Sequence, residues 1–165
     1  MKALTIWQPW ASLIACGAKR FETRSWATSL RGKIAIHAAL RPAHELDRKT
    51  SAAIVRAFDD CASIEDLPGY IAKLPHGAVV ATAELVGCHK MWDGSSVGLR
   101  GAVCIDMPNQ YWSPNWQTET DEFILGDWRP GRFAWELRNV KLLPTPVRAK
   151  GQQGLWDWDE REGMK

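Results

Sequence analysis

The sequence contains neither a long apolar run nor closely spaced cysteines, and each absence excludes a class of protein. No stretch approaches the roughly 20 apolar residues of a membrane-spanning helix, and the N-terminal MKALTIWQPW lacks the pattern of a signal peptide. The four cysteines form no Cys-x-x-Cys pair, so neither a disulfide framework nor a zinc site is indicated. We therefore expect a cytoplasmic protein with no membrane contact, no metal and no cofactor.

Net charge is also nearly absent, because 21 basic side chains accompany 19 acidic ones for a formal charge of +2. The charges are unevenly distributed along the chain. Residues 1–42 contain seven Lys or Arg and one acidic residue, and residues 132–150 contain five Lys or Arg and one acidic residue. If these two basic segments are neighbours in the fold, they form a patch suited to phosphate. The alternative is that the charges point in unrelated directions on a nearly neutral surface.

What the chain has in excess is tryptophan, with ten in 165 residues. Indoles carry much packing area, so several of them belong to the core. Ten are more than a small core usually takes, and a groove that stacks nucleic-acid bases would use some of the others.

Hydrophobic patterning predicts mostly strands, with helices inserted between some of them. A short helix opens at Pro9, where the missing N–H costs nothing, and stops at Gly17. This order favours a single mixed α+β domain over residues 1–165. The expected strands cover 2–7, 21–26, 33–37, 77–91, 102–107, 133–143 and 154–159.

Two segments interrupt this pattern. Residues 41–76 read as a helical insertion, in which a Ser63-x-x-Asp66 pattern caps the second helix and Pro68-Gly69 bends or breaks it. Residues 92–131 are rich in Gly, Pro, Asn, Ser and Trp, so we expect long loops with little regular structure.

The stretch GAKRFETRSW, residues 17–26, is the first candidate for a site. Strand alternation places Glu22, Arg24 and Trp26 on one face, while Phe21 points to the core. Lys19 lies just after Gly17 and is expected to reach in from the turn. The alternative is an exposed strand on which Glu22 pairs with Lys19 or Arg24, a contact worth about 0–1 kcal/mol.

The helix that begins at Pro9 adds backbone hydrogen-bond donors to this site. The first turn of a helix carries free backbone N–H groups and the positive end of the macrodipole, which suit an anion. Gln8 and Ser12 can supplement these donors. The helix is short, so its start and the strand after it lie close together.

Short motifs spread along the chain, among them QPWASL at 8–13 and GxKxxExRSW at 17–26, resemble the ASCH domain. This is the activating signal cointegrator homology domain of the PUA-like superfamily, here in its small bacterial and phage versions. The Gly-x-Lys-x-x-Glu-x-Arg element is the hallmark of that domain. The resemblance covers nearly the whole chain except the helical insertion and the long loops. Its motifs here are QPWASL at 8–13, GxKxxExRSW at 17–26, RG at 31–32, IAIHA at 34–38, GAVV at 77–80, GRFAWEL at 131–137 and KGQQGLW at 150–156.

The resemblance implies a pseudo-barrel of mainly antiparallel strands, with flanking helices that line a cleft. It implies that the hallmark residues line this cleft and that RNA, or nucleic acid more broadly, is the expected ligand. Family branches differ in activity: some members resemble RNA-binding adaptors, one branch hydrolyses the acetyl amide of N4-acetylcytidine, and ribonuclease activity is attributed to another.

This chain departs from the amidohydrolase branch at one hallmark position. Lys19 matches the lysine of that branch, but Glu22 replaces its threonine, so a hydroxyl nucleophile is missing there. A second acid would be needed, and Glu84 is the candidate that the sequence offers. His37 is a structural or ligand-contacting histidine, or a base for RNA cleavage.

Three hypotheses follow. The favoured one is an RNA-binding module that holds a nucleotide, a base or a modified base in the cleft. The second is a metal-independent hydrolase of a modified nucleoside or RNA, with Lys19 and Glu22 catalytic, and the third is an adaptor without chemistry. The expected ligand-binding residues are Gln8, Trp10, Ser12, Lys19, Glu22, Arg24, Trp26 and His37.

Overall fold

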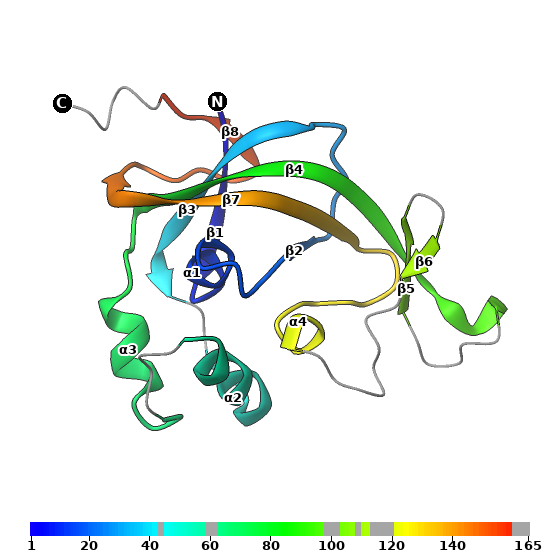
Figure 1. Cartoon of the computed structure of the whole chain (residues 1–165), viewed down its shortest axis with the longest axis horizontal. Helices are drawn as coiled ribbons and strands as arrows, with labels where there is room; N and C mark the ends of the chain where they lie inside the picture. The colour runs from blue at the N-terminus through cyan, green and yellow to red at the C-terminus, as the bar shows by residue number, and fades with distance from the viewer. Residues whose placement is uncertain (43–44, 59–62, 98–102, 108–109, 113–120, 160–165) are drawn as a thin grey trace.

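A curved β-sheet forms most of the molecule (Figure 1). The computed structural model describes residues 1–42, 45–58, 63–97, 103–107, 110–112 and 121–159. Six strands follow one another in the order β2-β7-β4-β3-β1-β8, and β5 and β6 extend from one end of β4. The strands are β1 (Lys2–Gln8), β2 (Phe21–Arg24), β3 (Gly32–Pro42), β4 (Ala78–Asp93), β5 (Val103–Met107), β6 (Gln110–Trp112), β7 (Phe133–Arg148) and β8 (Leu155–Asp157).

Neighbouring strands run antiparallel except for β1 and β3, which are parallel. The long strands β4 and β7, of 16 residues each, pair along most of their length and carry three irregularities in register. Such bulges increase local twist and bend a sheet. The prediction of a mixed α+β fold with a mainly antiparallel sheet is confirmed.

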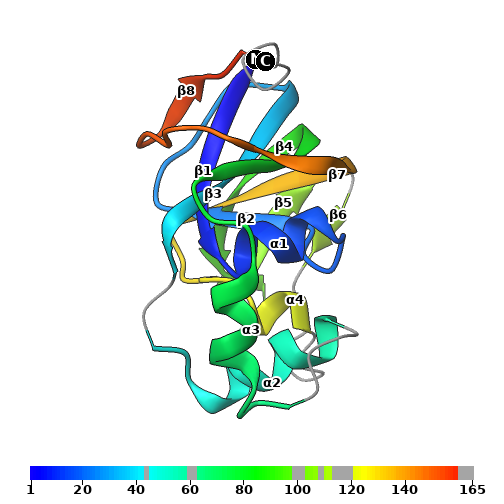
Figure 2. The same ribbon diagram turned by 90° about the vertical axis from the view of Figure 1, so that its left-hand side faces the viewer.

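The helices lie on one side of the sheet (Figure 2). The short helix α1 (Trp10–Ala15) lies against the sheet, and α2 (Arg48–Ala57), α3 (Leu67–Lys73) and α4 (Asp121–Ile124) lie beyond it. A 3₁₀ helix, η1 (Gly94–Val97), follows β4. In the described part of the chain, no helix is long and apolar enough to cross a membrane.

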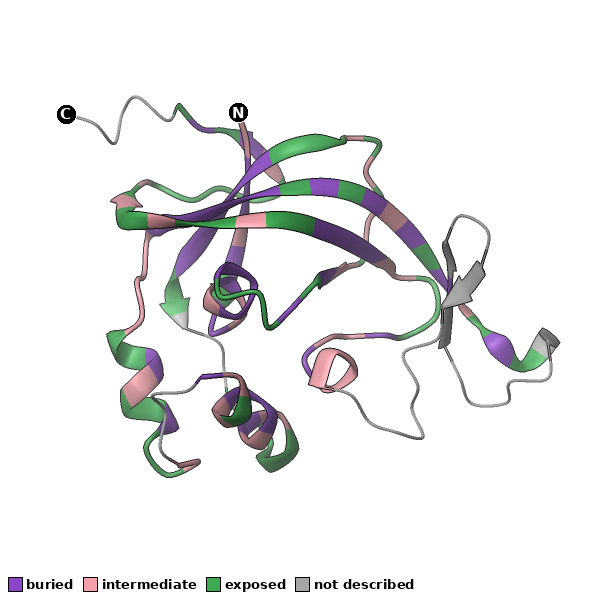
Figure 3. Cartoon of the chain, viewed as in Figure 1, coloured by how far each residue is buried: buried purple, intermediate pink, exposed green. Residues whose placement is uncertain are grey.

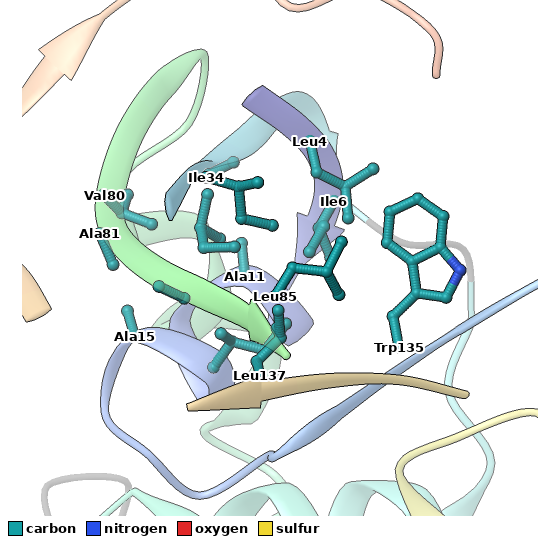
Figure 4. Close-up of a cluster of buried hydrophobic side chains, with 14 residues drawn as sticks. Leu4, Ile6, Ala11, Ala15, Ile34, Val80, Ala81, Leu85, Trp135 and Leu137 are labelled. Atoms are coloured by element: carbon teal, nitrogen blue, oxygen red, sulfur yellow. The ribbon is translucent and has the colours of Figure 1, made fainter. Parts of the chain in front are cut away.

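Helix α1 is buried from two directions, which explains its apolar sequence. Ala11 and Ile14 pack into a cluster with strand residues such as Leu4, Ile34, Leu85 and Trp135 (Figure 4). Leu13, on another side of the helix, packs with residues of α2 and α3. A helix that is apolar around most of its circumference is stable when other elements cover it on both sides. Figure 3 shows buried segments along the central strands, interrupted by exposed positions, and further buried positions on α1.

Several elements differ from their predicted bounds. Strand β2 ends at Arg24, two residues early, whereas β7 continues to Arg148. Pro68 lies in the first turn of α3 instead of breaking the helix, because the backbone N–H has no helical partner there. Within the 92–131 segment, the strand expected at 102–107 is present as β5, whereas the short elements η1, β6 and α4 were not expected.

Candidate nucleic-acid site

A cavity of about 540 Å³ lies where the ends of β1 and β2 meet the helical layer. We call it the first cavity. Strands supply one wall, and residues of α2, α4 and the turn after α4 supply the other. The lining residues are Thr5, Ile6, Trp7, Trp10, Glu22, Thr23, Arg24, Thr50, Ile124, Leu125, Gly126, Asp127 and Arg132.

Glu22 and Arg24 form a charged pair in this wall. The Nε of Arg24 lies 3.0 Å from Oε1 of Glu22, although the N–H is not aligned as a hydrogen bond. The Nη2 of Arg24 donates to the carbonyl oxygen of Thr5 at 2.8 Å. Glu22 is only 8% exposed, and the Arg24 guanidinium is the cation beside it. The pair is held by β1 through Thr5, and both of its residues line the cavity.

A second charged pair comes from the turn after α4. The Nε of Arg132 donates to the carbonyl of Asp127 at 3.2 Å and lies 3.3 Å from its Oδ2. Arg129 donates to both carboxylate oxygens of Asp127, and these bonds lower the pKa of that carboxyl, with burial opposing and Arg132 assisting. Asp127 therefore stays an acceptor near neutral pH.

Thr23 joins the two pairs, and sequence reasoning missed it. Its Oγ1 accepts a hydrogen bond from the backbone N–H of Asp127 at 2.9 Å, and its carbonyl accepts from Nη2 of Arg132 at 3.4 Å. Simple alternation placed Thr23 on the face away from Glu22 and Arg24. Because the 124–127 turn folds over the edge strand β2, all three residues line the same cavity.

Among the described residues, two indoles line the first cavity, and one of them was predicted. Trp10 comes from the start of α1, and Trp7, which is 51% exposed, comes from β1. Trp26 lies elsewhere, because β2 ends before it. Its ring packs edge-to-face on Trp135 at 4.5 Å, and its carbonyl accepts from the Trp135 indole N–H. Trp26 thus supports the core instead of lining the cavity.

Lys19 is buried but is not among the residues that line the first cavity. It is 1% exposed, and its Nζ lies 3.8 Å from Oε1 of Glu122 without a hydrogen bond to any described residue. The Glu122 carboxylate accepts from the backbone N–H groups of Arg20 and Phe21 at 2.7 and 3.1 Å. Lys19 therefore helps to hold α4 against the start of β2. The sequence did not indicate Glu122 as a partner of Lys19, because it is one of several acids between residues 119 and 127.

At the start of α1, the N–H of Ser12 is already bonded within the protein. The Gln8 side chain accepts from the Ser12 N–H at 3.1 Å and donates to the Ser12 hydroxyl and the Pro75 carbonyl. Gln8 is fully buried. Gln8 and Ser12 therefore bond each other and tie α1 to the segment before β4, and neither lines the first cavity.

Arg20 turns away from the cavity to a separate buried cluster. Burial raises the pKa of Glu136, but hydrogen bonds from Arg20, His89 and Arg138 outweigh it and lower the pKa to about 2. This cluster links β2, β4 and β7. Glu84, the candidate second acid, is exposed and accepts from Asn139, so it lies outside the site.

His37 lines a different cavity, described below, and does not meet Glu22 or Arg24. Its Nε2 lies 3.0 Å from the carbonyl oxygen of Ala149, and its ring packs edge-on against Trp156. Burial lowers the pKa of His37, with the Ala149 contact opposing, so the ring is neutral near pH 7. A neutral ring that donates from Nε2 satisfies this contact.

No group of three or more His, Cys, Asp or Glu side chains with metal-site geometry occurs among the residues that the structure describes. A search of curated proteins finds no match. The family model of the ASCH domain matches residues 4–118, more than half of the chain. The curved, mainly antiparallel sheet with helices along one side agrees with the PUA-like pseudo-barrel of that domain. On this match, the chain belongs to the ASCH-domain family.

Proposed function

We propose that the protein is an RNA-binding module that holds one base or nucleotide in the first cavity. The observation that carries the proposal is the combination of indoles and paired charges around a single hollow: Trp7 and Trp10 beside Glu22–Arg24 and Asp127–Arg132. A volume of about 540 Å³ falls within the range of roughly 300–1,000 Å³ that is typical of small-molecule sites. A cytoplasmic location remains a prediction.

The two kinds of wall support different parts of base recognition. Stacking on an aromatic side chain contributes about 1–3 kcal/mol per base and tolerates any base. Carboxylates accept from exocyclic amino groups, and guanidiniums donate to ring nitrogens and carbonyls, so the two pairs can read base edges. Because the Arg24 guanidinium is held by Thr5, its orientation is set before a ligand arrives.

The hydrolase hypothesis proposes Lys19 and Glu22 as catalytic residues. Here the amine of Lys19 lies beside Glu122, and Glu22 lies beside Arg24, so the two are directed to different partners. These contacts favour an orienting role for Glu22 over attack on a ligand. The test below therefore also distinguishes hydrolysis of a nucleoside and an adaptor function from RNA binding.

The test measures quenching of tryptophan fluorescence at low salt by single-stranded oligoribonucleotides of about eight residues and by nucleosides. We expect quenching by both, and affinity at least tenfold weaker for Arg24→Ala. Arg31→Ala is the matched control, because Arg31 is exposed, bonds only to nearby carbonyls and does not line the cavity.

Absence of quenching with every ligand, or equal losses for Arg24→Ala and Arg31→Ala, would contradict the proposal. The same nucleoside panel, including an N4-acetylated cytidine, is analysed for products. Product formation that Glu22→Gln abolishes would replace binding by hydrolysis. Capture of a protein partner that is unchanged by Arg24→Ala, without RNA binding, would favour the adaptor.

A further inference from the structure

A second cavity of about 820 Å³ lies next to the first. The end of β3, the residue before β4 and the segment that follows β7 form its walls. Thr5 and Trp7 of β1 line both cavities, so they form a shared boundary. The lining residues are Thr5, Trp7, His37, Ala39, Leu40, Arg41, Gly77, Arg148, Ala149, Lys150, Gly151, Gln152 and Gln153.

The second cavity carries uncompensated positive charge. Arg41, Arg148 and Lys150 line it and are exposed, and none of the three forms an ion pair with another described residue. The described residues of its lining include no Asp or Glu. Two other basic side chains of the sheet have acidic partners: Lys2 pairs with Asp157, and Arg138 pairs with Glu136. A concave surface with three free cations and no acid is complementary to an anion.

The segment that carries Lys150 is held in place by His37 and Gly77. The carbonyl of Ala149 lies 3.0 Å from Nε2 of His37, and the N–H of Ala149 donates to the Gly77 carbonyl at 3.1 Å. Gly151 lies so close to the imidazole that an added Cβ would be 2.4 Å from its Cε1. Lys150 is therefore placed between two residues that are anchored to His37, and its side chain extends from a fixed backbone.

The shared boundary suggests how the two cavities act together. On one side, the carbonyl of Thr5 accepts from Arg24 of the first cavity. On the other, the Thr5 hydroxyl accepts from the indole of Trp156 and lies beside Gly151. Trp7, half exposed, lies two residues further along the strand and borders both hollows. A single-stranded RNA with one base in the first cavity would therefore pass Trp7 on its way to Arg41, Arg148 and Lys150.

We infer that the second cavity binds a backbone phosphate of single-stranded RNA, next to the nucleotide whose base lies in the first cavity. This inference rests on the proposed function. Arg41, Arg148 and Lys150 contact the phosphate oxygens, and Trp7 contacts the linking nucleotide. Such contacts position the strand without reading its sequence, whereas the base edge is read in the first cavity.

The test compares oligoribonucleotides of about eight residues with nucleosides, which have no phosphate. The variant is Arg148→Ala/Lys150→Ala, and the charge-matched control is Lys90→Ala/Lys141→Ala, whose lysines are exposed and line neither cavity. We expect the variant to bind oligonucleotides at least tenfold more weakly at low salt, with nucleoside affinity unchanged. The slope of log affinity against log salt should fall by about 0.7 for each phosphate that the variant no longer neutralises.

An unchanged oligonucleotide affinity and salt slope in Arg148→Ala/Lys150→Ala, or reductions equal to those of the control, would overturn the inference. Failure of the proposed function gives a different result: Arg24→Ala then binds oligonucleotides as the wild type does, and nucleosides do not bind. In that case weaker binding by the Arg148/Lys150 variant alone supports a phosphate site and overturns its link to a bound base. Absence of oligonucleotide binding by the wild type overturns both.

Discussion

The two cavities share Thr5 and Trp7 but differ in how their charges are balanced. In the first cavity each cation has an acid beside it, Arg24 with Glu22 and Arg132 with Asp127. In the second, Arg41, Arg148 and Lys150 line a surface whose other described residues include no Asp or Glu. The first is walled by both the sheet and the helical layer, whereas strand ends and one extended segment form the second.

This difference separates two tasks of nucleic-acid recognition. Paired, partly buried charges are oriented by each other, so they present donors and acceptors at fixed positions and favour selectivity. Unpaired exposed charges are solvated and mobile, and they attract phosphate through their field, which salt screens. Substitutions in each cavity can test whether the two differ in this way.

The largest effect on stability is expected from Arg24→Ala. It removes a charged donor from the Thr5 carbonyl and leaves Glu22, 8% exposed, without its cation. Because Arg24 itself is partly solvated, we expect a decrease of about 2 kcal/mol in the free energy of unfolding. Chemical denaturation of the wild type and the variant measures this difference in the free energy of unfolding.

The matched variant for that measurement is Arg148→Ala in the second cavity. Arg148 is exposed and has no ion pair among the described residues, so its removal should change stability by no more than about 0.5 kcal/mol. Equal decreases in the two variants would show that the charges of the two cavities are not balanced differently.

A smaller effect is expected from Gly151→Ala in the second cavity. The added Cβ would lie 2.4 Å from Cε1 and 2.7 Å from Nδ1 of His37, too close without movement. Because the overlap must be relieved by small displacements of the imidazole and the anchored segment, we expect the free energy of unfolding to fall by about 1 kcal/mol. Nucleoside binding in the first cavity should not change.

Gly69→Ala is the matched control for this substitution. A Cβ there meets nothing within 4 Å, and Gly69 lies inside α3. Alanine in a helix stabilises by roughly 0.5–1 kcal/mol relative to glycine, so the control should shift stability in the opposite direction. A thermal melt that shows stabilisation in both variants would contradict the close packing of Gly151 on His37.

The smallest effect is the pH dependence contributed by His37. Burial holds its pKa below the ordinary value of 6.5, so the unfolded chain takes up a proton at higher pH than the folded chain. Its contribution to stability is therefore fully present above about pH 6.5 and is lost as the pH falls below it. The melting temperature of the wild type should fall more steeply between about pH 7.5 and about pH 5 than that of His37→Asn. Parallel pH profiles for the two proteins would contradict a neutral, buried His37.

Most elements of the fold could be predicted from local patterns. Alternating apolar residues located the strands, and Pro9 and Gly17 marked the ends of α1, because these signals depend on a few neighbouring residues. Boundaries were less accurate. Strand β7 continues through two prolines to Arg148, because β4 pairs along it and its second half lies at the exposed part of the sheet.

The site was predicted only in part. Trp10, Glu22 and Arg24 were named and line one cavity, whereas Gln8, Ser12, Lys19, Trp26 and His37 were named and do not. The omitted residues Thr23, Asp127 and Arg132 meet through contacts that span more than 100 positions. No periodicity in a sequence encodes such distances.

The sequence by itself determined the strand-rich α+β class, the family and the chemical types available near Arg24. Each of these rests on short motifs or on side chains whose preferences are local. Only the tertiary structure decided which charges face one another, because that depends on how the turn after α4 crosses β2 and how the segment after β7 crosses His37. Long-range packing thus places Arg24 and Arg132 beside acids in the first cavity. It places Arg41, Arg148 and Lys150 together in the second, positively charged cavity.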